Sequence, residues 1–143
     1  MNSPLEHPPN ASQLMADPAV IQALDQAWED SQSDDPGARH EEGGWIYMNA
    51  STGEIKIRRA MSGMQTAIDL SDPPMLDDCV VVGKFHTHPN PTSAGWHPGP
   101  SPSDLAIAER HGVPDLIRAD DGMHFSGPES RRGGPGGEPG YPA

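Results

Sequence analysis

The chain has 143 residues, enough for one modest hydrophobic core, and only 34% of them are hydrophobic. Its net charge is −12, from 21 acidic and 9 basic residues. This charge has the same sign as a phosphate backbone, so we expect no nucleic-acid partner, and a basic protein surface would suit it better. One cysteine, Cys79, excludes an internal disulfide and a multi-cysteine zinc site, and its apolar neighbours predict a small buried hydrophobe.

Glycine and proline are frequent at both ends and in residues 89–102. This composition predicts a disordered segment over residues 1–12, a folded domain over residues 13–127 and a Gly/Pro-rich tail over residues 128–143. The N-terminal residues lack the basic and apolar regions of a signal peptide, and no apolar run approaches the ~18 residues of a membrane span. We therefore expect a soluble, cytoplasmic protein without a membrane partner.

Residues 17–31 are the first periodic segment, and they predict a helix with Asp17 as its cap and Pro18 at its first position. Apolar residues recur there with helical spacing, at Val20, Ile21, Leu24, Ala27 and Trp28. The stripe predicts a helix packed on the core, with Trp28 inside it.

A β-hairpin follows, with strands predicted at residues 44–50 and 54–60 and a turn at 51–53. Alternation in the second strand places Ile55 and Ile57 on its core face. The remaining predicted elements are a short strand at 64–70 (or an irregular connection), a buried strand at 79–88, a helix at 104–112 ending at Gly112, and strands at 115–118 and 122–126. The expected fold class is mixed α+β.

His86 and His88 lie at the C-terminal end of the strand predicted at 79–88, which Pro89 ends. Residues two apart on a strand face the same way and lie roughly 6.5–7 Å apart along it. Both rings can therefore converge on one ion at the ~2.0–2.1 Å zinc–nitrogen distance. Pairs of histidines on a sheet face also occur without a metal, so the pattern alone is not specific.

A third ligand is available in Ser101-x-x-Asp104, which has two interpretations. As a capping box, Ser101 and Asp104 would satisfy the first N–H groups of the next helix, with Pro102 at its first position. As a metal site, the Asp104 carboxylate would turn to the ion and complete a set of two histidines and one carboxylate. That set leaves the fourth tetrahedral position for water, as a hydrolytic zinc requires.

A zinc hydrolase also needs a carboxylate outside the ligand set to accept a proton from water. Glu41, which comes directly before the first hairpin strand, fits this role; Glu42 competes with it, and both carboxylates could simply be solvated. Ser101 would stand beside the metal as a hydroxyl donor to the oxyanion of the tetrahedral intermediate. The loop at 89–102 carries Trp96 and either contacts substrate or is a disordered cover.

Residues 41–110 together resemble the JAMM motif of the JAB/MPN metalloprotease family. The matching segments are Glu41-x-x-Gly44 ahead of a strand, His86-Thr87-His88-Pro89 and Ser101-x-x-Asp104. The resemblance implies a curved sheet flanked by helices, of cytidine-deaminase-like architecture, and a zinc held by His86, His88 and Asp104. It also makes Glu41 the general acid/base and Ser101 the oxyanion donor. Glu42 is not assigned the general acid/base role, since the family glutamate precedes the glycine of the motif by three positions.

The resemblance further implies hydrolysis of peptide or isopeptide bonds, often after the C-terminal Gly-Gly of a ubiquitin-like or sulfur-carrier protein, and the single-domain layout resembles the prokaryotic branch. Two alternatives are a peptidase acting on small or cell-wall peptides and a non-catalytic MPN-type scaffold, although such scaffolds typically lack the ligands. The interval between His88 and Ser101 is longer than the family's usual one. His97 and His124 are expected to be dispensable for metal binding.

The tail contains Arg131-Arg132-Gly133-Gly134, which looks like the end of a ubiquitin-type substrate. A narrow cleft beside a zinc would admit an extended Gly-Gly segment, so the tail could act as a tethered competitor of the substrate. The alternative is a solubilising appendage whose glycines reflect composition alone.

Overall fold

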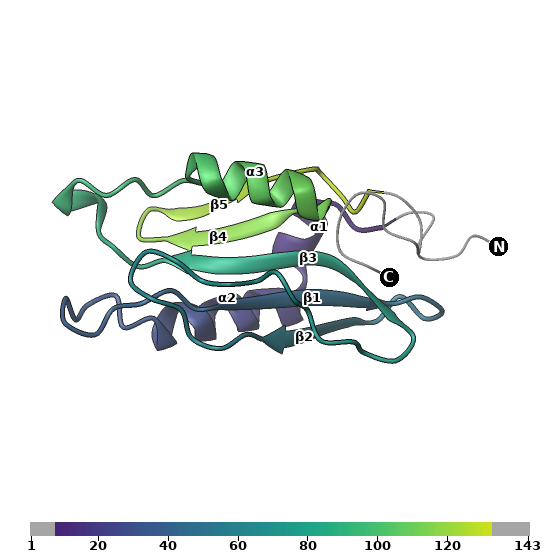
Figure 1. Cartoon of the computed structure of the whole chain (residues 1–143). Helices are drawn as coiled ribbons and strands as arrows, with labels where there is room; N and C mark the ends of the chain where they lie inside the picture. The colour runs from purple at the N-terminus through teal and green to yellow at the C-terminus, as the bar shows by residue number, and fades with distance from the viewer. Residues whose placement is uncertain (1–7, 133–143) are drawn as a thin grey trace.

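The computed structural model describes residues 8–132, which form a mixed α+β fold around a five-stranded sheet (Figure 1). The elements in chain order are α1 (Ala11–Ala16), α2 (Pro18–Asp30), β1 (Gly43–Asn49), β2 (Ile55–Arg59), β3 (Cys79–His88), the 3₁₀ helix η2 (Thr92–Ala94), α3 (Pro102–His111), β4 (Asp115–Ala119) and β5 (Gly122–Ser126). The strand order is β2-β1-β3-β4-β5. β3 and β4 are parallel and connected through α3, and the other neighbours are antiparallel. The mixed α+β class expected from the sequence is therefore confirmed.

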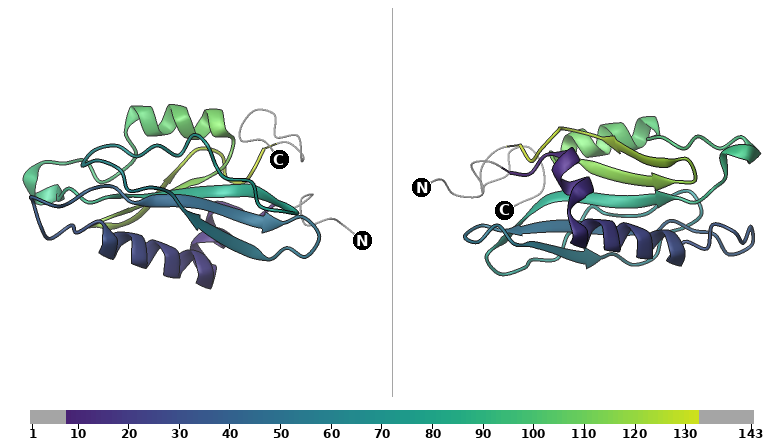
Figure 2. Two further views of the ribbon diagram at one scale, coloured as in Figure 1. Left: turned by 60° about the horizontal axis from the view of Figure 1, so that its bottom comes forward. Right: turned by 180° about the vertical axis from the view of Figure 1, so that it is seen from behind.

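Helices cover both faces of the sheet (Figure 2). On one face α1 and α2 pack against β1, β3 and β4 around a buried cluster that includes Leu14, Leu24, Ile46, Val82 and Leu116. On the other face lie α3 and the long connection between β2 and β3, over a second cluster of Trp45, Tyr47, Leu70, Val81 and Val113. These two clusters fix the sheet between its covering layers.

The helical region begins earlier than the sequence indicates. Asn10 caps α1, and Ala11 is buried, so residues 10–12 belong to the fold and are not a disordered segment. The cap of α2 is as predicted, since Asp17 Oδ1 accepts a hydrogen bond from Ala19 N at 2.9 Å. The apolar stripe is narrower than expected, because Ile21 is 43% exposed.

Trp28 is also outside the core. Its ring is half-buried, and the guanidinium of Arg118 lies 5.0 Å from its centroid. A bulky amphipathic ring at the margin of the stripe is thus covered by a cation and not by apolar side chains. Cys79 is likewise only partly buried, because it is the first residue of β3.

The hairpin of β1 and β2 matches its prediction, and Ile55 and Ile57 pack on the core side. Residues 64–70 form no strand, so the strand prediction is wrong and the alternative, an irregular connection, holds. β1 is already flanked by β2 and β3, so no strand position beside it remains for this segment. The connection is irregular there, but Met64 O accepts from Glu41 N and Glu41 O accepts from Gly63 N, both at 2.8 Å.

A β-bulge decides which side chains of β3 face α3. The pairing of β3 with β1 contains one shift in register, which changes the alternation of sides along the strand. Val82 and Phe85 both pack on the α1–α2 side. Lys84, His86 and His88 consequently share the opposite face, where they meet side chains of α3.

The first residues of the expected tail belong to the domain. Ser130 forms an isolated β-bridge with Asn10, and the buried Arg131 donates from Nη1 to Val81 O at 2.7 Å. Arg132 N donates to Gly112 O at the end of α3. The Gly-Gly pair at 133–134 lies outside the described residues. No helix within residues 8–132 has the length and apolarity needed to cross a membrane.

Candidate metal centre

His86 and His88 point to the same place at the C-terminal end of β3. Their Nε2 atoms lie 3.2 Å apart. Two ligand nitrogens on a tetrahedral zinc, each ~2.0–2.1 Å from the ion, are necessarily roughly 3.3 Å apart. The predicted convergence of the two rings is therefore present without any rearrangement.

The Asp104 carboxylate completes a triangle with these nitrogens. Its Oδ2 lies 3.2 Å from His88 Nε2, and its Oδ1 lies 3.7 Å from His86 Nε2. The same carboxylate accepts a hydrogen bond from Ser101 N, while Asp104 N donates to Ser101 Oγ, each at 3.0 Å. Oδ2 makes the capping contact and also lies nearest to His88, so a single orientation of the carboxylate serves both the capping box and the metal position.

Glu41 approaches the two histidines from β1's side. A carboxylate oxygen of Glu41 and ring nitrogens of His86 and His88 all lie within 4.8 Å of one another, so this buried group could hold a metal ion. Burial raises the pKa of Glu41 to about 7, despite the nearby histidines. The shorter contacts of Asp104 favour that carboxylate as the ligand and leave Glu41 as a second carboxylate beside it.

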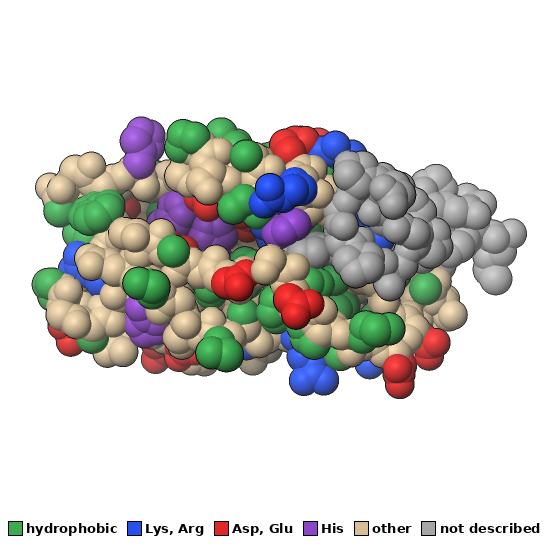
Figure 3. All heavy atoms as spheres, in the orientation of Figure 1, with side chains coloured by type: hydrophobic (Ala, Val, Ile, Leu, Met, Phe, Trp, Pro, Cys, Tyr) green, Lys and Arg blue, Asp and Glu red, His purple; other side chains and the backbone are tan. Residues whose placement is uncertain are grey.

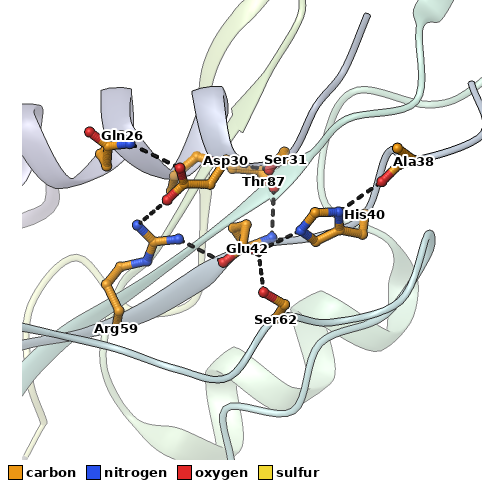
Figure 4. Close-up of polar contacts among 10 residues, drawn as sticks. Gln26, Asp30, Ser31, Ala38, His40, Glu42, Arg59, Ser62 and Thr87 are labelled. Carbon is orange, nitrogen blue, oxygen red and sulfur yellow. Dashed lines mark hydrogen bonds and ion pairs between the residues drawn. The ribbon is translucent and has the colours of Figure 1, made fainter. Parts of the chain in front are cut away.

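Glu42, the competing candidate, is held by a separate set of polar side chains (Figure 4). Its carboxylate lies 2.5 Å from His40 Nε2, 2.6 Å from Arg59 Nη2 and within hydrogen-bond distance of Ser62 Oγ. Neighbouring residues of an extended chain point to opposite sides, so fixing Glu42 on the α2 side directs Glu41 to the α3 side. The choice of Glu41 over Glu42 therefore has a structural cause.

The outer nitrogen of each histidine is held by an acceptor. His86 Nδ1 lies 3.0 Å from Asp115 Oδ1, and His88 Nδ1 lies 3.2 Å from Pro98 O. Because both partners only accept, each Nδ1 carries a hydrogen, and Nε2 is the nitrogen that faces the centre, where a metal would displace any proton on it. This is the tautomer that a metal ligand needs.

The local potential favours a cation. Burial alone would lower the pKa of His86, but the carboxylates of Asp115 and Asp104 outweigh it and raise that pKa to about 10. Burial alone would likewise raise the pKa of Asp104, yet hydrogen bonds from the two histidines hold it well below its usual range. A potential that favours a proton here also favours a metal cation.

Two hollows meet at Glu41, Ser101 and Asp104. One, of about 220 Å³, runs beneath α3 past Lys84 to His111. The other, of about 460 Å³, is lined by the loop that follows β3, including Trp96 and His97. Figure 3 shows histidine and acidic side chains within the hollow below α3. The candidate centre is therefore open to a ligand from two directions.

Each predicted site residue can now be placed. The structure brings together all five: Glu41, His86, His88, Ser101 and Asp104. His97 is exposed on the rim of the larger hollow, and His124 pairs with Asp121 at 2.8 Å, away from the centre. Sequence reasoning missed Asp115, whose only signal was an acidic residue opening an apolar strand.

Comparison of the chain with protein-family models, curated proteins and solved structures finds no match.

Proposed function

We propose that this protein is a zinc-dependent hydrolase of peptide or isopeptide bonds, of JAB/MPN type. The observation that carries the proposal is the convergence of His86, His88 and Asp104 beside a separate buried carboxylate, Glu41. Two imidazoles, one carboxylate and an open side are the ligand arrangement of a catalytic zinc. The α+β layout with helices on both faces of the sheet is compatible with the JAB/MPN architecture.

Zinc suits these donors better than a hard cation does. Mg²⁺ and Ca²⁺ prefer oxygen ligands, whereas imidazole nitrogen favours zinc and other transition metals. The hydrogen bonds to both Nδ1 atoms fix His86 and His88 in the orientation that ligation requires. A bound zinc would supply a Lewis acid that activates water and polarises the scissile carbonyl.

Glu41 performs the proton transfers in this proposal. With its pKa raised by burial to about 7, the carboxylate takes a proton from the attacking water and passes it to the leaving nitrogen. The C–N bond breaks, and the products are a carboxylate and an amine. Ser101 Oγ accepts from Asp104 N, which leaves its own O–H to donate to the developing oxyanion.

The proposed substrate is a ubiquitin-like or sulfur-carrier protein, cleaved after its Gly-Gly end. An extended Gly-Gly segment has no side chains to clash with the walls where the two hollows meet at Glu41 and Asp104. The experiment is to load the purified protein with one equivalent of zinc and offer it a ubiquitin-like protein extended beyond its Gly-Gly. We expect cleavage that a chelator stops and zinc restores. Absence of cleavage together with absence of zinc binding would contradict the proposal.

A further inference from the structure

Lys84 is a buried basic residue for which the proposed hydrolysis has no use. It is 2% exposed and lies on β3 two residues before His86, facing the same side of the sheet. Within residues 8–132 its ammonium makes one hydrogen bond, to His111 Nδ1 at 2.9 Å. A lysine ammonium has three donors, and burying it is costly unless it has a partner.

The ammonium opens onto the cleft that contains the candidate centre. Lys84, Arg110 and His111 line the same hollow of about 220 Å³ as Glu41 and His86. Two residues of strand separate Lys84 from His86, or roughly 6.5–7 Å. In Figure 3 basic side chains and a further histidine lie along the hollow below α3, beyond the first group of histidine side chains. The cleft thus has a metal centre at one end and a basic group further along.

This basic end stands out because the surrounding molecule is acidic. The chain carries a net charge of −12, so an anionic ligand is repelled by most of the surface. Asp115 is turned to His86, and Asp69, on the rim, accepts from Ser71 N and Oγ. Asp115 and Asp104 also act on the Lys84 ammonium. Lys84 and Arg110 are the positively charged side chains that line this cleft.

We propose that the Lys84 end of the cleft binds the free α-carboxylate of the substrate's C-terminal residue, so that the enzyme releases short C-terminal peptides. This inference rests on the proposed function and specifies its substrate. Lys84 lines the same cleft as His86. The expected leaving group is therefore a short peptide that reaches from the centre to Lys84.

The position of the carboxylate also orients the substrate. A free α-carboxylate exists only at the C-terminal end of a peptide, so the Lys84 end must be the leaving-group side. The acyl side then lies in the hollow lined by Trp96 and His97, on the other side of Asp104. An isopeptide substrate would place no free α-carboxylate at Lys84, so the inference favours linear extensions over branched conjugates.

Binding to an inactive protein tests this subsite without requiring turnover. The probe is a synthetic peptide ending in Gly-Gly-Ala-Phe, titrated calorimetrically into zinc-loaded Glu41→Gln protein. A second form carries a C-terminal amide, and a third is the amide with Glu as its last residue. We expect the free acid to bind about tenfold more tightly than the first amide, which is the effect of one well-placed charge pair.

Variants at two lysines test whether Lys84 causes the preference for the free acid. Lys84→Met in the same background should remove the preference for the free acid, and Lys56→Met, on the exposed face of β2, should keep it. If Lys84→Met does not fold, Arg110→Gln, on exposed α3 surface, should reduce the preference several-fold. Zinc content and thermal unfolding confirm that each variant is folded.

Equal binding of acid and amide would overturn the inference. So would tight binding of the Glu-terminated amide, because the subsite would then read an acidic side chain and not the chain end. Hydrolysis of the same peptides by the unmodified protein tests the proposed function separately. A clear preference for the free acid without any cleavage would support the subsite and contradict the hydrolase.

Discussion

His86 Nδ1 lies 3.0 Å from Oδ1 of Asp115, a 1% exposed residue on the neighbouring parallel strand β4. The contact links the candidate metal centre to the part of the sheet that follows α3. We expect Asp115→Asn to weaken zinc affinity about 10–100-fold, because the amide no longer fixes the His86 ring and its tautomer. Competition with a chromophoric chelator measures the change. Asp121→Asn, which alters a surface contact with His124, is the matched control, and equal affinities in the two variants would contradict the role of Asp115.

Zinc should stabilise the folded protein through the same centre. Zinc at 100 times its dissociation constant adds about 2.7 kcal/mol to the free energy of unfolding, provided that the unfolded chain does not bind it. Thermal unfolding with zinc and with a chelator measures the shift. His88→Ala should abolish it and His124→Ala should not. A shift that survives His88→Ala would place the metal elsewhere.

Glu42→Gln should affect stability and not chemistry. The Glu42 carboxylate is buried among His40, Arg59 and Ser62, and hydrogen bonds to charged groups contribute about 1.5–3 kcal/mol each. We expect the free energy of unfolding to fall by about 2 kcal/mol, as measured by urea denaturation. Hydrolysis per folded molecule should be unchanged. A loss of turnover in a stable Glu42→Gln protein would reopen the choice between the two glutamates.

His111 should make the metal-free protein sensitive to acid. Burial lowers the pKa of His111 to about 4, and Lys84 and Arg110 act in the same direction. The unfolded chain, with a histidine pKa of about 6.5, therefore binds more protons between those values. Stability from this group is present above about pH 6.5 and is lost as the pH falls towards 4.

The expected result is a smaller fall in melting temperature between pH 7 and pH 4.5 for His111→Asn than for the unmodified protein. Both are measured with a chelator present, and His124→Asn is the control. The same fall in all three proteins would show that His111 does not carry the acid sensitivity.

Two truncations separate the packed start of the tail from its end. Removing residues 128–143 takes away the buried Arg131 and its hydrogen bond to Val81 O, and should lower the melting temperature by several degrees. Removing residues 133–143 keeps Arg131 and its hydrogen bond to Val81 O. Only this shorter truncation can test whether Gly133-Gly134 competes with substrate, which a lower KM at constant kcat would indicate. Equal melting temperatures for both truncations would show that Arg131 contributes nothing.

Local patterns predicted most of the fold because they depend on neighbouring residues. The β3 span, the hairpin and the cap of α2 follow from β-branched runs, alternation and capping. The prediction of a strand at 64–70 was wrong because a strand needs another strand to pair with. Tertiary structure decides whether such a partner is available. The prediction that Trp28 lies in the core was wrong because Arg118, 90 positions along the chain, covers its ring.

In the candidate site, too, features that depend on neighbouring residues were predictable, and features that depend on tertiary structure were not. His86, His88 and Asp104 could be named from short-range spacing and the expected ends of elements. The partners of their outer nitrogens, Asp115 and Pro98 O, are set by strand pairing and loop geometry, which a single sequence does not specify. Lys84 was also missed, although it lies two residues before His86, because its partner His111 comes from α3.

The most direct measurement of the central claim is the turnover of zinc-loaded Glu41→Gln beside the unmodified protein, on a ubiquitin-like substrate extended beyond Gly-Gly. The amide keeps the size of the side chain but cannot accept a proton from water, so kcat should fall at least ~10²-fold. Zinc content and melting temperature should stay within error. Near-normal turnover by Glu41→Gln with its zinc in place would contradict the assignment of Glu41 and, with it, the proposed mechanism.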